Sequence, residues 1–307
     1  MNFKQLAVKL QDKKIVPGHR TCSGCGIPPI VRTVLASTDD PVVACCATGC
    51  WEVTSTIYPF TSWNIPFIHS AFENSAATGA GMEAAKKVLA KKGKCDKNIK
   101  VMAMGGDGGT YDIGFQSLSG ALERGHKMVY LLYDNEAYMN TGIQRSSATP
   151  YGAATTTTPA GKVHPGKEEF RKDIVKIVAA HNIPYIAQAS VSNLMDLSMK
   201  AEKAFKADGP AVLVCLQPCT LGWRFPPDKT IEIAKLAVES NFWPLYEIEN
   251  GKYKLNYKPS NPKPVLDFIK PQGRFKHLFK PENKKILDLI QKHTDEEFAK
   301  IEKLCEQ

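Results

Sequence analysis

The sequence predicts an α/β protein with a mostly parallel sheet that helices cover on both faces, followed by a C-terminal extension. Segments typical of strands and of helices alternate from residue 30 to residue 216. The strand segments are short apolar runs, such as residues 99–104 and 128–133, which is typical of strands buried on both faces. The chain has 307 residues with 43% hydrophobic content, so it can bury a sizeable core. Alternation of this kind indicates parallel strands joined by crossover helices.

The expected elements follow one another in a regular order. They are a helix at 30–37, strands at 42–45 and 65–69, a helix at 74–91, a strand at 99–104, a helix at 114–124, a strand at 128–133, a helix at 168–181, a strand at 185–189, a helix at 193–206 and a strand at 211–216. The helix at 74–91 is rich in small residues. In a sheet of this type, ligands bind at the carboxyl ends of the strands.

Two segments depart from the alternation. Residues 141–167 are rich in glycine, threonine and proline and are longer than a typical connection, so they predict a functional loop or a partner contact, with a mobile surface loop as the alternative. Residues 1–240 are expected to form the main domain. Residues 241–307 are expected to form a hairpin that turns on Asn-Gly and a helical arm at about 281–303. We expect this arm to pack on a companion subunit, or else to fray in solvent.

Two polar segments directly follow two of the expected strands. Asp107 lies in a run of glycines after the strand at 99–104, and Asn135 follows the strand at 128–133. Glycines let a phosphate approach the backbone amides, and a carboxylate can bind a hard cation. Mg²⁺ prefers octahedral oxygen ligands, some of which two phosphates can supply. Together the segments predict a magnesium and diphosphate site, whereas the glycine run alone could be an ordinary turn.

Nine cysteines are spread along the chain, and this odd number without a secretory signal argues against a disulfide framework. Cys22 and Cys25 are spaced as half of a metal or cluster site, and Cys50 and Cys219, at the exits of expected strands, are candidates for the other half. A structural zinc site is the alternative. A redox pair at Cys22 and Cys25 is disfavoured, because the glycines around it indicate a loop. The remaining cysteines are expected to be small buried residues or inert thiols.

Four motifs carry a specific resemblance to a known family. In chain order they are GHRTCSGCG at 18–26, ATGC at 47–50, GDG at 106–108 with YDIG at 111–114, and DNEAYMNTG at 134–142. The third and fourth resemble the motif of thiamine diphosphate enzymes. The whole set resembles the thiamine-binding beta subunits of the 2-oxoacid:ferredoxin oxidoreductase family, and most closely the branch that acts on pyruvate. Similarity continues through residues 147–152 and 158–162 to Cys219.

The resemblance implies a thiamine diphosphate-binding fold in residues 1–240, with two metal centres. Magnesium would be held by Asp107, the side-chain oxygen of Asn135 and the main-chain oxygen of Ala137. A 4Fe–4S cluster would be held near the thiamine by Cys22, Cys25, Cys50 and Cys219. The residues implied to bind the cofactor are Gly106, Asp107, Gly108, Gly109, Asn135, Ala137, Tyr138, Asn140 and Cys50. Many thiamine enzymes carry two asparagines where this chain has Asp134 and Asn135, but Asn135 keeps the ligand position.

The same resemblance implies roles for single residues around the thiamine. Asn140 is the expected catalytic residue, because its amide can donate a hydrogen bond to a developing oxyanion. Tyr138 is expected to pack at the turn. The glutamate that activates thiamine in this family is expected on a companion subunit, and Glu52, which follows Cys50, is expected to have only a structural role.

The implied function is that of the beta subunit in a hetero-oligomeric enzyme of anaerobic metabolism. The enzyme would decarboxylate pyruvate oxidatively and reversibly to acetyl-CoA and CO₂, passing electrons through 4Fe–4S clusters to ferredoxin. The expected partners are companion alpha, gamma and delta-type subunits, ferredoxin, coenzyme A and the 2-oxoacid substrate. A branched-chain 2-oxoacid or oxalate is the alternative substrate.

The net charge of +9, from 40 basic and 31 acidic residues, raises the question of nucleic-acid binding. The basic residues are scattered, apart from lysines clustered within residues 86–100 that are typical of a solvated helix end. Acidic ferredoxin or the phosphates of coenzyme A could also use this cluster. A zinc-binding nucleic-acid interaction protein is therefore only a remote alternative. The sequence has no run of about 18 apolar residues, so we expect no membrane contact and a place in the reducing cytoplasm.

Overall fold

The computed structural model describes residues 2–11 and 13–306 and contains, within that part of the chain, a single eight-stranded sheet. The strand order is β2-β1-β3-β4-β6-β5-β7-β8. From β2 through β1, β3, β4 and β6 to β5, each strand of the sheet is parallel to the next. Strand β7 is antiparallel to both of its neighbours, β5 and β8. The strands are β1 (Val42–Ala47), β2 (Phe67–Ser70), β3 (Lys100–Gly106), β4 (Val129–Asp134), β5 (Tyr185–Ser190), β6 (Ala211–Leu216), β7 (Leu245–Glu249) and β8 (Lys252–Tyr257).

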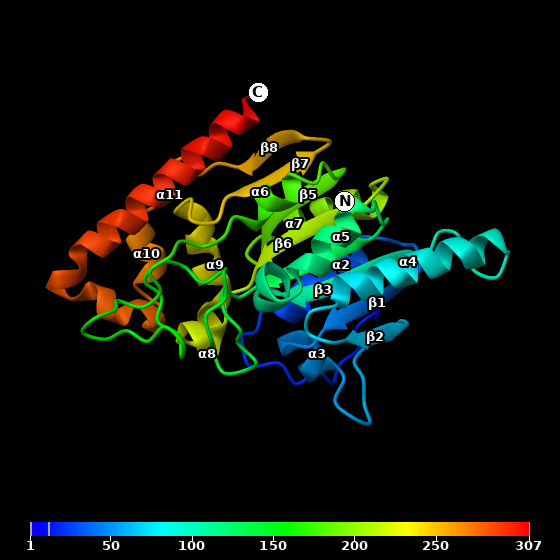
Figure 1. Cartoon of the computed structure of the whole chain (residues 1–307), viewed down its shortest axis with the longest axis horizontal. Coiled ribbons are helices and arrows are strands. Elements are labelled where there is room, and N and C mark those ends of the chain that lie inside the picture. The colour runs from blue at the N-terminus through cyan, green and yellow to red at the C-terminus, as the bar shows by residue number, and fades with distance from the viewer. Residues whose placement is uncertain (1, 12, 307) are drawn as a thin grey trace.

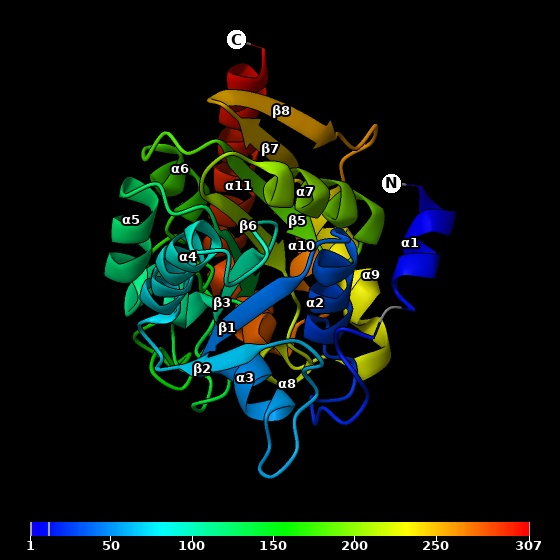
Figure 2. The same ribbon diagram turned by 90° about the vertical axis from the view of Figure 1, so that its right-hand side faces the viewer.

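Helices cover both faces of the sheet, as the sequence predicted. One apolar core joins the sheet to α4, α5, α6 and α11, and a second joins it to α2 and α7. Figure 2 shows strands between α4 and α5 on one side and α2 and α7 on the other. The helices are α1 (Phe3–Lys9), α2 (Ile27–Ala36), α3 (Cys50–Ser55), α4 (Ser75–Lys91), α5 (Phe115–Glu123), α6 (Ile174–Ala179), α7 (Leu194–Lys206), α8 (Thr220–Trp223), α9 (Thr230–Glu239), α10 (Val265–Ile269) and α11 (Lys284–Cys305).

Most predicted elements are found within a few residues of their expected ends, but the helix predicted at 168–181 is shorter. Helix α6 begins only at Ile174, because the Asp173 side chain accepts a hydrogen bond from the Lys176 amide and caps it. The residues before the cap are irregular. Arg171 donates to Asp134 at the end of β4, and Lys172 donates to the Tyr111 carbonyl in the turn after β3. A short π-helical turn, η1 (Gly108–Asp112), also follows β3 directly.

The C-terminal segment completes the sheet and then runs along it. The predicted hairpin is present, with Asn250 and Gly251 both at positive φ in the turn between β7 and β8. Its strand β7 pairs with β5 of the main sheet. Helix α11 follows the 3₁₀ turns η3 (Gly273–Phe279) and η4 (Pro281–Asn283) and lies beside β8 (Figure 1). The domain boundary after residue 240 and the contact of the arm with a companion subunit stay predictions.

The sheet register brings several strand ends to one level. Gly106 at the end of β3 pairs with Tyr133 near the end of β4, and Asp134 at the end of β4 pairs with Leu216 at the end of β6. Strand β1 ends beside β3. Helices α3 and α8, which follow β1 and β6, lie at the same end of the molecule in Figures 1 and 2. The loops after four strands therefore meet at one sheet edge.

Candidate functional site

A cavity of about 200 Å³ opens at this sheet edge. Its walls come from the loops after β1, β2, β3 and β4. The structure places every residue that the sequence implied for cofactor binding in these walls: Cys50, Gly106, Asp107, Gly108, Gly109, Asn135, Ala137, Tyr138 and Asn140. A Cβ atom at Gly108 would lie 2.4 Å from a carbon of the Tyr138 ring, so the absence of a side chain at this position lets the two loops meet.

Three polar groups of this cavity converge: the Asp107 carboxylate, the Asn135 side-chain amide and the Ala137 carbonyl. The side-chain oxygen position of Asn135 lies 2.9 Å from Asp107 Oδ1 and 2.8 Å from the Ala137 carbonyl oxygen. Three acceptors at such distances repel unless the amide rotates to donate or a cation lies among them. Adjacent ligands of an octahedral Mg²⁺, at its usual bond lengths, are about 2.9 Å apart. The donor set and its spacing therefore fit magnesium.

The electrostatics of Asp107 also fit a cation. The residue is 1% exposed, and burial raises the pKa of its carboxyl well above the usual range, with the nearby charge of Asp134 adding to the effect. The Ser146 hydroxyl donates to Asp107 Oδ2 and opposes this shift. A divalent cation at the three oxygens would favour the carboxylate form and remove the cost of burying it.

Of the four cysteines that the sequence singled out, Cys50 lines this cavity. Cys22 is exposed, and Cys25, Cys50 and Cys219 are half-buried. Burial, together with the neighbouring Cys219 and Cys22, raises the pKa of the Cys25 thiol to about 12. Burial and then Cys219 and Cys25 raise the pKa of Cys50 in the same way. The sulfurs are therefore close enough to disfavour one another's thiolate forms, which an iron cluster would stabilise.

Hydrogen bonds hold the loop of Cys22 and Cys25 against the segment that follows Cys219. The Thr220 hydroxyl donates to the Ser23 carbonyl at 3.2 Å, and the Thr230 hydroxyl donates to the Gly24 carbonyl at 2.6 Å. Among residues 2–11 and 13–306, no three His, Cys, Asp or Glu side chains converge on one point as ligands of a single metal ion do. A 4Fe–4S cluster differs from a single metal ion in this respect, because each of its four cysteines binds through its own thiolate.

The remaining predicted residues have distinct surroundings. Asn140 is exposed at the rim of the cavity. The Tyr138 ring packs edge-on against Phe72, with ring centroids 5.5 Å apart. Glu52 is buried, accepts a hydrogen bond from Thr56 and lies 3.3 Å from His69, and it lines no part of this cavity.

The sequence did not indicate several residues that the structure brings to the site. Phe72 lines the cavity, Ser146 donates to Asp107, and the Trp223 indole donates to the Asn135 carbonyl at 2.8 Å. Two arginines, Arg171 and Arg274, reach the loop of Asn135 from outside. Ser146 precedes a recognised motif, but no local pattern marks Arg171, Trp223 or Arg274, because their partners lie far away in the chain.

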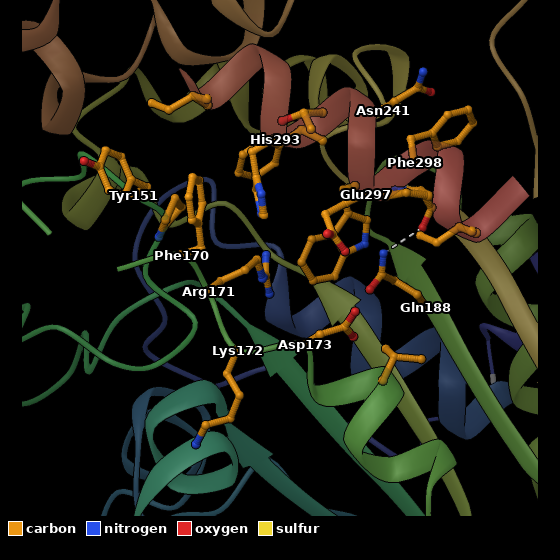
Figure 3. Close-up of a pocket in the computed structure, with 18 of the residues that line it drawn as sticks. Tyr151, Phe170, Arg171, Lys172, Asp173, Gln188, Asn241, His293, Glu297 and Phe298 are labelled. Carbon is orange, nitrogen blue, oxygen red and sulfur yellow. Dashed lines mark hydrogen bonds between the residues drawn. The ribbon is translucent and has the colours of Figure 1, made fainter. Parts of the chain in front are cut away.

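A second cavity, of about 320 Å³, lies beneath α11 and contains none of the predicted site residues. Figure 3 shows His293 of α11 beside Phe170, and Arg171 and Asp173 on the opposite side. The rings of His293 and Phe170 stack with centroids 3.6 Å apart, and the Arg171 guanidinium lies 4.6 Å from the centroid of the Trp243 ring. Arg171 lines this cavity and also donates to Asp134 and Glu136, which flank Asn135.

Comparison with known proteins agrees with the geometry. The family model described as the thiamine pyrophosphate enzyme, C-terminal TPP binding domain, matches residues 43–215. Pyruvate synthase subunit PorB of Thermotoga maritima is 52% identical over 310 residues, which cover 98% of this chain and 95% of the relative. The chain belongs to the 2-oxoacid:ferredoxin oxidoreductase family. Membership confirms the resemblance that the motifs carried, and with it a thiamine diphosphate-dependent enzyme subunit.

Other members of the family show its range. Pyruvate synthase subunit PorB of Methanocaldococcus jannaschii is 53% identical, covering 93% of this chain and 95% of the relative. Ketoisovalerate oxidoreductase subunit VorB of Pyrococcus abyssi is 46% identical, covering 96% and 94%. A solved structure of 2-oxoglutarate:ferredoxin oxidoreductase from Magnetococcus marinus matches with a TM-score of 0.58 at 22% identity, covering 90% of this chain and 94% of that one, which shows a shared fold. No helix in the described ranges is both long and apolar enough to cross a membrane.

Proposed function

We propose that this chain is the thiamine-binding subunit of a pyruvate:ferredoxin oxidoreductase and that the 200 Å³ cavity holds thiamine diphosphate through Mg²⁺. The observation that carries the proposal is the convergence of the Asp107 carboxylate, the Asn135 side-chain amide and the Ala137 carbonyl in the cavity that Cys50 also lines. One oxygen of each group would be a protein ligand of Mg²⁺. Gly106, Gly108 and Gly109 would keep side chains away from the diphosphate.

Cys22, Cys25, Cys50 and Cys219 would hold a 4Fe–4S cluster. Cys50 lines the cofactor cavity and is also an electrostatic neighbour of the other three thiols. A cluster on these residues would therefore lie next to the thiamine, where electrons can leave the cofactor over a short distance. Burial and hydrogen bonds to sulfur would set its potential.

The side chains around the cavity have separate tasks in the proposed reaction. When bound, thiamine diphosphate supplies a carbon nucleophile that adds to the 2-oxoacid carbonyl and takes up the electron pair released with CO₂. Asn140, at the exposed rim, would donate a hydrogen bond to the oxygen that becomes negative. The packed rings of Tyr138 and Phe72 would close one wall and keep water from the reacting carbon.

We infer the substrate from the names of the relatives. The relatives at 52% and 53% identity are named pyruvate synthase subunits, which favours pyruvate. A branched-chain 2-oxoacid is the second candidate, because a ketoisovalerate oxidoreductase subunit is 46% identical over nearly the whole chain. We further propose that the chain works in the cytoplasm with companion subunits, ferredoxin and coenzyme A, and that a companion supplies the activating glutamate.

One anaerobic experiment tests the proposed function. The assembled complex is assayed for viologen reduction with pyruvate, 2-oxoisovalerate and oxalate, each with and without coenzyme A. We expect reduction with pyruvate that requires coenzyme A. A preference for 2-oxoisovalerate would select the second candidate, and activity without coenzyme A would favour oxalate.

A chemical assay on the same chain tests the cluster. We expect about four irons and four sulfides per chain, as for a single 4Fe–4S centre. Both should be lost in Cys219→Ser and kept in the control Cys95→Ser, whose half-buried thiol donates to the Lys86 carbonyl. Zinc without sulfide would overturn the assignment.

A further inference from the structure

Glu136 occupies a strained position in the loop after β4. It lies between Asn135 and Ala137, which are the proposed magnesium ligands of this loop. Its φ of 66° falls in the left-handed region, which residues other than glycine seldom adopt. Its side chain is fully buried. A backbone held in this region needs contacts that determine its conformation from outside.

Two arginines provide such contacts. Arg171 Nη1 donates to one carboxylate oxygen of Glu136 at 3.1 Å, and Arg274 Nη2 donates to the other at 2.5 Å. Arg274 follows Glu136 by 138 residues and belongs to η3, and only 3% of its side chain is exposed. The Thr149 hydroxyl donates to the Glu136 carbonyl at 2.7 Å, and the Glu136 amide donates to Asp134 Oδ1 at 3.0 Å. The backbone and the side chain of Glu136 are thus both fixed.

Trp223 joins the same arrangement. Its indole Nε1 donates to the Asn135 carbonyl at 2.8 Å, and the Arg274 guanidinium lies 3.9 Å from the centroid of its ring. Trp223 ends α8, the short helix that Cys219 caps. Arg274 is therefore in contact both with the loop of the proposed magnesium ligands and with the helix that follows a proposed cluster ligand.

We propose that Glu136 and Arg274 are positioning residues of the magnesium site. Their ion pair holds the left-handed turn that directs the Asn135 side chain and the Ala137 carbonyl to the same point. Neither residue lines the cofactor cavity, so neither touches the reacting groups. Because Mg²⁺ tolerates little deviation from octahedral geometry, a small rotation of this turn weakens the metal site. The inference rests on the proposed function for the presence of the metal.

The test measures metal affinity rather than turnover. Mn²⁺, as a paramagnetic substitute for Mg²⁺, is titrated into the metal-depleted complex in the presence of thiamine diphosphate and followed by electron paramagnetic resonance. We expect Arg274→Met and Glu136→Gln to weaken Mn²⁺ binding about 10-fold to 100-fold, the usual effect of removing a group that orients a metal ligand. Arg274→Lys, which keeps the charge, should recover part of the affinity.

Two further variants separate positioning from loss of a buried charge pair. Lys200→Met breaks another buried ion pair, at 2.6 Å from Asp196 within α7, and should leave Mn²⁺ affinity unchanged even if it lowers stability. The double variant Glu136→Gln with Arg274→Met leaves no unpaired charge from this pair. It should unfold at a higher temperature than Arg274→Met alone while still binding Mn²⁺ weakly.

The outcomes distinguish this inference from the proposed function. Wild-type affinity in the double variant, or in Arg274→Met, would overturn the positioning role alone. A wild-type complex that binds no Mn²⁺ together with thiamine diphosphate would overturn the proposed function, and the inference would fall with it.

Discussion

At the scale of single residues, glycines decide how closely the loops of the site approach. Gly108 is where the loop after β3 meets the Tyr138 ring, and Gly114 lies against the carbonyl of Gly109. At both positions a Cβ atom would come closer than 3.0 Å to its neighbours. A methyl group in either place must therefore displace part of the site.

Gly108→Ala should lower the affinity for thiamine diphosphate and Mg²⁺. The added Cβ would lie 2.4 Å from the Tyr138 ring, so this ring, which lines the cavity with Ala137, must move. We expect a loss of at least about tenfold, measured by calorimetric titration of the complex with the cofactor, by analogy with other changes that disturb ligand orientation.

Gly81→Ala provides the matched control. Gly81 lies in α4 with no atom within 4 Å of the added Cβ, so the substitution should leave cofactor affinity unchanged and stabilise the helix by up to about 1 kcal/mol. Equal cofactor affinity in the two variants would show that the contact between Gly108 and Tyr138 is unimportant.

Lys167 should make stability depend on alkaline pH. Burial, together with the charge of Arg145, lowers the pKa of this amine to about 8. The Lys167 Nζ nevertheless donates to the Thr149 carbonyl at 2.7 Å. Between pH 8 and the usual lysine pKa of about 10.4, the unfolded chain holds a proton that the folded chain has lost. The free energy of unfolding contributed by this group therefore rises with pH across that range.

The Lys167 prediction is checked by urea unfolding of the wild type and of Lys167→Met at pH 7, 8.5 and 10. The stability of the wild type relative to the variant should increase from the first pH to the last. The exposed Lys162→Met controls for the loss of one positive charge in the same loop. A constant difference between wild type and Lys167→Met would contradict the prediction.

At the scale of elements, strand register and helix caps place the functional loops. Strands β3, β4 and β6 end at one level, so the loops that follow them meet without long connections. The cap at Asp173 delays the start of α6 and leaves Arg171 free to reach Asp134 and Glu136. Periodicity in the sequence extended this helix too far, because it does not register the local hydrogen bond by which the Lys176 amide donates to the Asp173 cap.

Helix α11 should contribute to stability through one face only. Ile290 is 4% exposed and packs in the core, whereas its neighbour Leu289 is 40% exposed. We expect Ile290→Ala to lower the free energy of unfolding by about 2 kcal/mol, the low end for a buried aliphatic residue, because a cavity already lies beside it. Leu289→Ala should cost less than about 1 kcal/mol. Chemical denaturation measures both, and similar losses would mean that α11 does not pack as the structure shows.

At the scale of the whole molecule, the proposed cofactor cavity contains, among the described residues that line it, no acidic group suited to activate thiamine. Within the described residues, the carboxylate that lines this cavity is Asp107, a proposed metal ligand. Glu52, which follows Cys50, is held by His69 and Thr56 outside the cavity. We propose that another subunit completes the site at this sheet edge.

The purified chain alone should therefore not turn over a 2-oxoacid. Reconstituted with Mg²⁺, thiamine diphosphate, iron and sulfide, it should bind cofactor yet reduce no viologen with pyruvate until the companion subunits are added. Robust pyruvate-dependent reduction by the chain by itself would contradict this prediction and would place the activating group in this polypeptide.

The sequence by itself determined the fold class and the candidate ligands. The apolar runs of β3 and β4 require burial on both faces, and the residues after them, Asp107 and Asn135, keep their places because a short segment must follow its strand. The spacing of Cys22 and Cys25 is likewise local information.

Only the tertiary structure decided what supports these ligands. The pairing of Glu136 with Arg274 across 138 residues, the contact of Trp223 with Asn135 and the left-handed turn between two ligand positions have no local signature. Such contacts depend on how distant segments pack against a common core, and neither periodicity nor motif spacing records that arrangement. The chemistry of the site can thus be read from short motifs, whereas its geometry is a property of the folded chain.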